Sequence, residues 1–313
     1  MQHAPRITDF PDGISAIDTE YVRPMMDASH LLVRGSRAAF IDTGTTHSVP
    51  LLLAALEAKG IPREAVEYVL LTHVHLDHAG GAGELMAALP SATAVLHPRG
   101  APHMVDPSRL IQGSIQVYGE ESFRELYGDI RPIPGERIRT VEDGDTLQFG
   151  GGTLEFLHTE GHARHHYCIV DHETGGIFSG DSFGLSYREL DTDRGEFIFP
   201  STTPVQFDPE AAVATVDRLM SLTPSAIYLT HYSRVLDLGR LAEDLKEDLR
   251  AYERIALTEG PGDEPALEAG IREYMYRRLD EHGCDAEPAW REDIIGGDIR
   301  LNTQGLAVWL ARQ

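Results

Sequence analysis

Three histidines and one aspartate lie close together in this chain, directly after an apolar segment. Residues 67–71 read EYVLL, and residues 72–78 read THVHLDH. Packing alone does not explain so many imidazoles in so short a stretch. Neutral imidazole and carboxylate are ligands of zinc, iron and manganese, and alternate residues of an extended segment point the same way. We therefore expect a strand end at which His73 and His75 hold one metal ion, while Asp77 and His78 face a second.

One short segment cannot complete two metal sites, and other strand ends supply further candidates. His162 follows the strand-like residues 153–158, Asp181 lies in the sequence GIFSGDS, and His231 ends AIYLTH. Ligands at strand ends are held by the sheet rather than by flexible loops, as a preorganised site requires. These three residues are therefore the next candidates for metal binding.

The order of apolar runs predicts a mixed α/β protein. Short apolar runs separated by turns over residues 14–44 are typical of consecutive antiparallel strands. Strand and helix then alternate, as they do in α/β folds: a helix at 48–59, a strand at 67–72, a helix at 80–89 and a strand at 92–97. Residues 98–135, rich in proline and glycine, are expected to be an irregular excursion on the substrate side.

After His231 the sequence changes character. Residues 239–260 and 265–283 carry apolar side chains at helical spacing between charges, which is typical of amphipathic helices. We expect a catalytic domain at residues 1–236 and a helical C-terminal extension, residues 237–313, packed on it. The alternatives are an independent domain and a homodimer formed through these helices.

The charge balance and the cysteine content limit the partners and the compartment that we expect for this protein. The chain of 313 residues has 27 Lys and Arg against 50 Asp and Glu, a net charge of −23. This balance disfavours nucleic acid and anionic membranes, whose recognition needs basic surfaces. No apolar run reaches the roughly 18 residues that span a bilayer. Two cysteines, Cys168 and Cys284, and a start without a signal sequence favour the cytoplasm.

The HxHxDH segment, the Gly161-His162 pair, the Gly180-Asp181 pair and the last strand-end histidine together resemble the metallo-β-lactamase-fold hydrolase superfamily. The resemblance extends to the DTG sequence that begins at Asp42 and covers roughly residues 14–235. It implies a four-layer αββα sandwich with a dinuclear site on one edge. The glyoxalase II-like branch is the nearest, because His166 follows His162 by four residues; the lactamases proper are not favoured.

The resemblance also implies roles for individual residues. His73, His75 and His162 match the ligands of the first metal, Asp77, His78 and His231 match those of the second, and Asp181 matches the bridging carboxylate. Asp42 and His166 are expected to hold the ligand side chains in place without binding the metal themselves. The sequence departs from the branch in having Glu160 before Gly161, His165 three residues after His162, and Thr230 and Tyr232 on either side of His231.

These residues predict a hydrolase of a small-molecule ester, thioester, lactone or phosphodiester. Two divalent ions, zinc first and iron or manganese as alternatives, would activate a bridging hydroxide. Asp77 and Asp181 are the catalytic carboxylates, and Asp77 could also carry a proton to the leaving group. Weaker candidates for substrate contact are Tyr187, Tyr232 and Arg234. The competing hypotheses are a di-iron sensor of oxygen, nitric oxide or redox state, and a binding protein with vestigial hydrolysis.

Overall fold

The computed structural model describes residues 4–203 and 205–313, and the chain divides into two compact units that interleave along the sequence. The first unit contains residues up to His158, His165–Gly180 and Thr230–Ser233; the second contains Thr159–Arg164, Asp181–Leu229 and Arg234–Gln313. These units do not follow chain order, whereas the predicted domains divide at residue 236. The predicted boundary stays a prediction.

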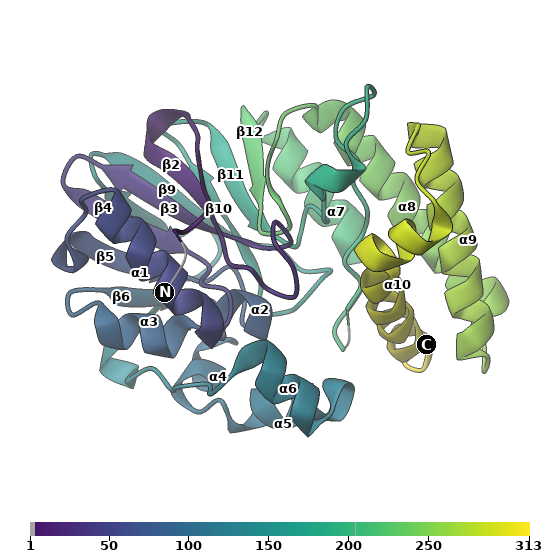
Figure 1. Ribbon diagram of the computed structural model, residues 1–313, viewed down its shortest axis with the longest axis horizontal. Helices are drawn as coiled ribbons and strands as arrows, with labels where there is room; N and C mark the ends of the chain where they lie inside the picture. Colours follow the sequence, from purple (N-terminus) through teal and green to yellow (C-terminus); the bar gives the residue numbers. More distant parts are fainter. Residues whose placement is uncertain (1–3, 204) are drawn as a thin grey trace. The chain divides into compact units, whose positions relative to one another are not determined.

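The first unit contains a seven-stranded sheet, antiparallel over its first four strands and parallel over the rest (Figure 1). Its strands follow chain order: β1 (Ile7–Asp9), β2 (Ile14–Asp18), β3 (Ala28–Arg34), β4 (Arg37–Ile41), β5 (Val66–Leu70), β6 (Thr93–Leu96) and β7 (Ile138–Thr140). The predicted change from antiparallel strands to an α/β alternation is therefore confirmed. The carboxyl end of β5 leads directly into the histidine segment.

Helices α1 (Val49–Ala58) and α3 (Ala82–Ala88) cover one face of this sheet. Val49, Leu52 and Leu56 of α1 recur at helical spacing and pack in one apolar cluster with Leu31 and Phe40 of the sheet. Fully burying a Leu or Phe side chain contributes about 1.5–3 kcal/mol. This cluster is therefore a main source of the rigidity of the sheet from which the histidine segment emerges.

A second sheet includes four strands of the first unit, in the order β11-β10-β9-β8, all antiparallel. They are β8 (Thr146–Phe149), β9 (Gly152–His158), β10 (Tyr167–Asp171) and β11 (Gly176–Gly180). β10 and β11 are buried along their whole length. The strand-like segments expected around residues 153–182 are confirmed.

The excursion at residues 98–135 is helical, so the prediction of irregular structure there is wrong. It contains α4 (Ala101–Val105), α5 (Ser108–Tyr118) and α6 (Glu120–Tyr127). Pro102 lies in the first turn of α4, Pro107 directly precedes α5, and Gly119 separates α5 from α6. Proline is tolerated at helix starts and glycine at helix ends, so these residues mark helix boundaries.

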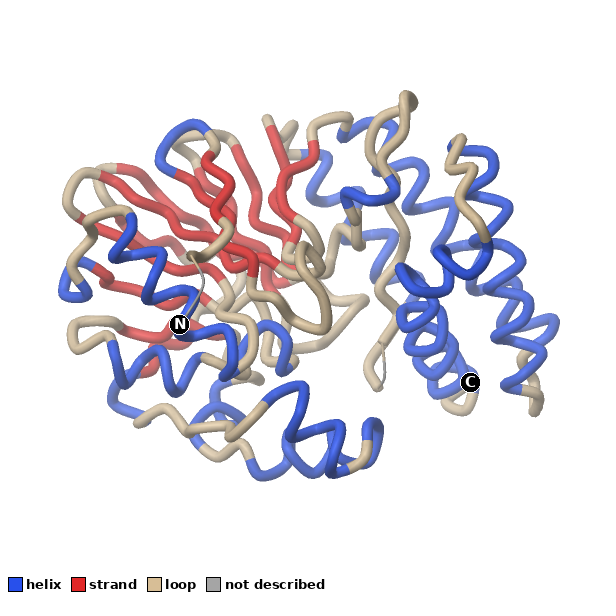
Figure 2. The backbone as a smooth tube through the Cα atoms, in the orientation of Figure 1, coloured by secondary structure: helices blue, strands red, loops and turns tan. Residues whose placement is uncertain are grey.

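The second unit is mostly helical, as the blue segments toward the C-terminus in Figure 2 show. It contains α7 (Pro209–Ser221), β12 (Ala226–Leu229), most of β13 (Ser233–Val235), α8 (Leu238–Glu259), α9 (Glu264–His282) and α10 (Pro288–Leu310). The two predicted amphipathic helices correspond to α8 and α9. α10 lies in the predicted helical extension, but its own bounds are not predicted, because Gly296 and Gly297 interrupt its pattern; burial of Ile295, Ile299 and Leu306 offsets the low helix propensity of glycine.

The C-terminal helices are joined to residues 181–221 within this unit. Tyr187 donates a hydrogen bond to Asp298 of α10 over 3.2 Å, and the Thr202 backbone donates to Asn302 over 2.7 Å. Two sheets, helices over the first sheet and a set of C-terminal helices confirm the predicted mixed α/β class. Within residues 4–203 and 205–313, no helix is long and apolar enough to cross a membrane.

Candidate metal centre

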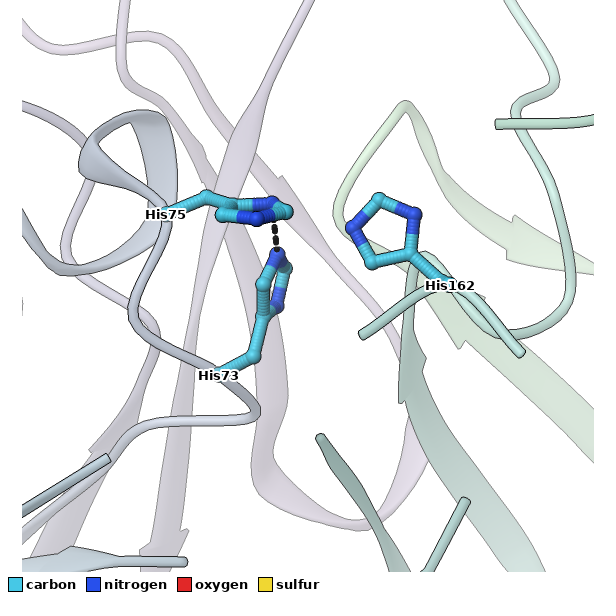
Figure 3. A group of neighbouring side chains, drawn as sticks. All are labelled: His73, His75 and His162. Carbon is cyan, nitrogen blue, oxygen red and sulfur yellow. Dashed lines mark hydrogen bonds between the residues drawn. The ribbon is translucent and has the colours of Figure 1, made fainter. Parts of the chain in front are cut away.

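The histidine segment leaves the first sheet at the end of β5 and turns into the short helix α2 (Leu76–Ala79). His73 and His75 lie in the extended part, and their facing ring nitrogens, Nε2 of His73 and Nδ1 of His75, are 2.9 Å apart (Figure 3). Two imidazole nitrogens at this separation need either a shared proton or a cation between them. The alternation expected from the sequence thus directs both rings to the same place.

A second group of ligand atoms forms entirely within the first unit. Oδ2 of Asp77 lies 3.6 Å from Nε2 of His78 and 3.6 Å from Nε2 of His231. One atom from each of the three side chains lies within 4.8 Å of the other two. Two neutral imidazoles and a carboxylate are a suitable donor set for zinc or iron. Asp77 and His78 precede His231 by some 150 residues in sequence. The three side chains nevertheless meet the first requirement of a metal site.

The buried carboxylate of Asp42 contacts the Nδ1 side of the His78 ring. Its Oδ2 lies 2.9 Å from Nδ1 of His78. The same carboxylate accepts hydrogen bonds from the Thr72 backbone over 2.8 Å and from the Thr230 hydroxyl over 2.9 Å. An acceptor at Nδ1 keeps the proton there and leaves the Nε2 lone pair for a metal. Asp42 thus ties together the segments that carry His73, His78 and His231.

Asp27 supports His231 in the same way, and sequence reasoning missed it. Its Oδ1 lies 2.7 Å from Nδ1 of His231, and its side chain is fully buried. Burial raises the pKa of Asp27 to about 6, and the neighbouring His231 opposes that rise. The only sequence signal is a lone aspartate directly before the buried strand β3. Each histidine of this triad therefore has its own buried carboxylate.

The second unit contains His162 and Asp181. Nε2 of His162 lies 3.6 Å from Oδ2 of Asp181. Ser201, also missed from the sequence, contacts both: its hydroxyl donates to Asp181 over 3.1 Å, and its carbonyl lies 3.2 Å from Nδ1 of His162. A donating Nδ1 again places the lone pair of His162 on Nε2, the atom that would bind a metal. A small cavity beside them is also lined by Leu245 and Leu249 of α8.

A glycine precedes each of these two residues for a steric reason. Gly161 has a φ of +125°, and a Cβ there would lie 2.4 Å from Cα of Ala212 in α7. Gly180 has a φ of +49°, and a Cβ there would lie 2.6 Å from Nε2 of His166 and 2.7 Å from the hydroxyl of Thr72. Only glycine fits both the backbone and the space. The Gly-His and Gly-Asp pairs are therefore tight turns that direct the ligands.

His166 and His165 lie beside the histidine segment in the first unit. The His166 ring stacks on the His73 ring at 4.8 Å, and the same side chain occupies the space next to Gly180. The His165 ring lies 5.5 Å from that of His75. His166 therefore touches both a predicted ligand and the turn before Asp181, as expected for a supporting residue.

The predicted substrate residues lie in different environments. Tyr187 is fully buried and hydrogen bonded to Asp298, and Tyr232 is buried against Ala16 and Ala28. Arg234 is half-buried at the start of the last stretch of the second unit. Their contact with substrate stays a prediction.

A family model described as the metallo-beta-lactamase superfamily matches residues 23–231. The match covers more than half of the chain and includes every predicted ligand, from His73 to His231. The chain belongs to the metallo-beta-lactamase superfamily.

Three curated relatives are similar to parts of the chain. The metallo-beta-lactamase fold-containing protein ST1585 of Sulfurisphaera tokodaii is 25% identical over 54% of this chain and 61% of its own length. A hydroxyacylglutathione hydrolase of Aeromonas hydrophila is 25% identical over 54% of this chain and 48% of its own. The acyl-coenzyme A thioesterase MBLAC2 of Gallus gallus is 31% identical over 54% and 62%. Each alignment spans less than two thirds of the relative.

Solved structures agree on the fold. The crystal structure of ST1585 from Sulfolobus tokodaii aligns with a TM-score of 0.65 at 21% identity, covering 94% of this chain and 98% of that one. TTHA1623, solved in a di-iron-bound form, aligns with a TM-score of 0.52 at 27% identity, covering 70% and 93%. These likenesses show the fold, whereas the superfamily match and the hydrolases among the relatives support a hydrolase, and the residues of the site could hold a metal ion.

Proposed function

We propose that this protein is a dinuclear metal-dependent hydrolase of small-molecule esters, with thioesters as the first class to test. The observation that carries the proposal is the triad of Asp77, His78 and His231, in which both histidines are fixed by buried carboxylates. Thioesters come first because two relatives are named as hydrolases of that bond type, one of an acyl-coenzyme A and one of a hydroxyacylglutathione. Lactones and phosphodiesters remain in the panel.

We further propose that His162 and Asp181 of the second unit complete the centre begun by the first. Chain connectivity supports this. Asp181 is bonded directly to Gly180 at the end of β11, and His162 lies three positions before His165, a reach of at most about 11 Å. Asp181 would then be the bridging carboxylate, and His73, His75 and His162 would hold the first ion.

The residues around this centre have distinct tasks. Two bound cations would supply the positive charge that activates a water and polarises the carbonyl under attack. Asp77 is half-exposed, unlike Asp27 and Asp42, so its carboxylate can meet solvent and pass a proton to the leaving group. The buried carboxylates of Asp27 and Asp42 fix the ring orientation of His231 and His78 and stay out of the reaction.

The test is a panel of matched esters, thioesters, lactones and phosphodiesters, assayed with the metal-free protein and after addition of zinc, manganese or ferrous ions. We expect thioester hydrolysis that appears only with metal. Absence of turnover in every class, in protein shown to be folded and metal-loaded, would contradict the proposal.

The Asp181→Asn variant tests the bridging role. An amide cannot bridge two cations as a carboxylate does, so we expect reduced metal content as well as a reduced rate. Ser201→Ala is the matched control, because it removes only the hydrogen bond to Asp181 and should retain both ions. Unchanged metal content in Asp181→Asn would contradict bridging.

A second candidate function is a di-iron sensor of oxygen, nitric oxide or redox state. The observation in its favour is the likeness to TTHA1623 in its di-iron-bound form. Imidazole and carboxylate suit iron as well as zinc. A visible absorption band that bleaches on reduction, in protein without hydrolytic turnover, would favour the sensor.

A further inference from the structure

Two buried tyrosines face each other in the first unit, outside the metal-ligand set. Tyr21 lies in the turn between β2 and β3, and Tyr127 ends α6. Their hydroxyl oxygens are 2.9 Å apart, their rings are stacked with centroids 5.8 Å apart, and their exposed fractions are 8% and 3%. This arrangement will be called the tyrosine pair.

Of the two hydroxyl protons of the tyrosine pair, only one takes part in the hydrogen bond between the two tyrosines. In a pair of hydroxyls one donates and the other accepts, so the acceptor still carries its own O–H. Within residues 4–203 and 205–313, the hydroxyl of each tyrosine is hydrogen bonded to that of the other and to no third group. Buried donors are normally satisfied. The remaining O–H therefore points to an acceptor that the described residues do not supply.

The tyrosine pair lies beside the candidate metal centre. Tyr21 and Tyr127 pack in one cluster with Phe123 of α6 and Leu76, the residue directly before Asp77. Figure 1 shows α6 next to α2, which carries both Leu76 and Asp77. Burial and the nearby charge of Asp77 raise the pKa of both tyrosines. Both hydroxyls therefore stay protonated.

Apolar side chains surround the tyrosine pair without being fully buried. Met26, Ile111 and Ile115 pack against this cluster while remaining half-buried, and no residue of α5 is buried. An amphipathic helix normally buries its apolar face. The face of α5 that looks toward the tyrosine pair therefore retains apolar area that a ligand could cover.

The turn that carries Tyr21 is strained. Glu20, Val22 and Met25 have φ values of +56°, +56° and +59°, and none is a glycine. Val22 is β-branched and 65% exposed, so contacts of its side chain offset little of the free-energy cost of the left-handed backbone. Asp18 holds the turn by accepting from the backbone of Glu20 over 3.0 Å and of Met25 over 2.9 Å. Strain of this kind concentrates at binding and catalytic sites.

We propose that Tyr127 donates a hydrogen bond to Tyr21, and that Tyr21 donates a hydrogen bond to an oxygen of the substrate's acyl group. Met26, Ile111 and Ile115 contact an apolar acyl chain. The substrate class is then an ester or thioester of a medium or long apolar acyl group. This inference rests on the proposed hydrolase function and names the part of the molecule that selects the acyl group.

The test compares acetyl, hexanoyl and decanoyl thioesters of N-acetylcysteamine with the zinc-loaded protein. We expect kcat/KM to rise about 10-fold or more from acetyl to decanoyl, because the longer acyl chain removes more apolar area from water. Ile115→Asn should lower kcat/KM for decanoyl far more than for acetyl. A flat or inverse dependence on chain length in the wild type would overturn the inference.

Tyrosine variants test the hydrogen bond. Tyr21→Phe should lower kcat/KM by about 10- to 100-fold, the effect of losing a buried hydrogen bond, with metal content unchanged. Tyr127→Phe leaves the donor in place and should cost about 3-fold or less. Tyr118→Phe is the control, because this ring touches Tyr127 edge-on at 5.8 Å but its hydroxyl is outside the pair. Equal, small effects of all three substitutions would overturn the role of Tyr21.

A binding measurement separates failure of this inference from failure of the hydrolase. The decanoyl and acetyl amides of cysteamine carry the same acyl groups but resist hydrolysis. Tighter binding of the decanoyl amide to the wild type, lost in Ile115→Asn, would support the acyl site even if no ester is turned over. Equal binding of both amides, with thioester turnover present, would overturn the acyl site and leave the hydrolase standing.

Discussion

Nδ1 of His231 lies 2.7 Å from the buried Oδ1 of Asp27, an aspartate that no motif in the sequence marks. The carboxylate holds the imidazole with Nε2 directed at Asp77. We predict that Asp27→Asn weakens zinc binding by about 10- to 100-fold, as loss of a carboxylate behind a metal-ligating histidine does. Competition with a chromophoric chelator measures the affinity.

The control for Asp27→Asn is Asp171→Asn. Asp171 is also fully buried, but it pairs with Arg34 over 2.5 Å and touches none of the predicted ligands. Its substitution should cost stability and leave zinc affinity unchanged. Equal zinc affinity in the wild type and Asp27→Asn would show that Asp27 does not position His231.

Asp42 should matter for folding as well as for metal binding. Its carboxylate accepts from Thr72 and Thr230 and lies against His78. Asn tolerates the left-handed backbone at this position, where φ is +56°, so Asp42→Asn tests the charge and not the turn. We predict a loss of about 2–4 kcal/mol in the free energy of unfolding, because hydrogen bonds to a charged group are worth about 1.5–3 kcal/mol each. Denaturant titration measures it, and a loss within error of zero would contradict the network.

His30 should make the stability of the protein depend on pH. It is fully buried in β3, with its ring edge-on to Phe178 at 5.4 Å, and burial lowers its pKa to about 4. The unfolded chain, with a histidine pKa near 6.5, binds the proton more readily, so this contribution to stability is present above about pH 6.5 and is lost as the pH falls toward 4.

The magnitude follows from the size of that shift. A difference of about 2.5 pKa units corresponds to about 3 kcal/mol. We predict that His30→Asn, which cannot take up a proton, reduces by about that amount the loss of stability between pH 6.5 and 4. Unfolding curves of wild type and variant across this range give the difference, and parallel curves would contradict the prediction.

Gly180→Ala should disturb the position of Asp181. The added methyl would meet His166 and Thr72 at 2.6 and 2.7 Å, in addition to the cost of a φ of +49°. Gly60→Ala is the matched control, because φ is +66° there but no atom lies within 4 Å. We predict that Gly60→Ala loses about 1 kcal/mol of stability and keeps its metal. Gly180→Ala should lose more stability and bind less than the wild-type amount of metal, and identical behaviour of the two variants would be evidence against the steric argument.

The sequence predicts most of the first unit, because the signals there are local. Apolar runs of strand length and the helical spacing of Val49, Leu52 and Leu56 each depend on neighbouring residues, and the structure confirms the elements they indicate. The excursion at 98–135 was wrongly expected to be irregular, because Pro107 and Gly119 mark helix ends as readily as loops. α10 forms through tertiary packing around Gly296, which no local pattern reveals.

Among the candidate site residues, the proposed ligands and the supporting residues Asp42 and His166 were predictable, whereas Asp27 and Ser201 were not. His73, His75 and Asp77 stand in one dense segment whose chemistry is visible without a structure. Asp27 and Ser201 are single polar residues in ordinary surroundings, and only the fold brings them to His231 and Asp181. The tyrosine pair likewise joins residues 106 positions apart.

The measurement that tests the central claim most directly is the metal content of the isolated protein, taken together with thioester turnover before and after chelation. The account predicts about two ions per chain, turnover that disappears with the ions, and turnover that returns when zinc is restored. Folded protein that binds no metal when zinc is supplied, or turnover that survives complete removal of the ions, would contradict it.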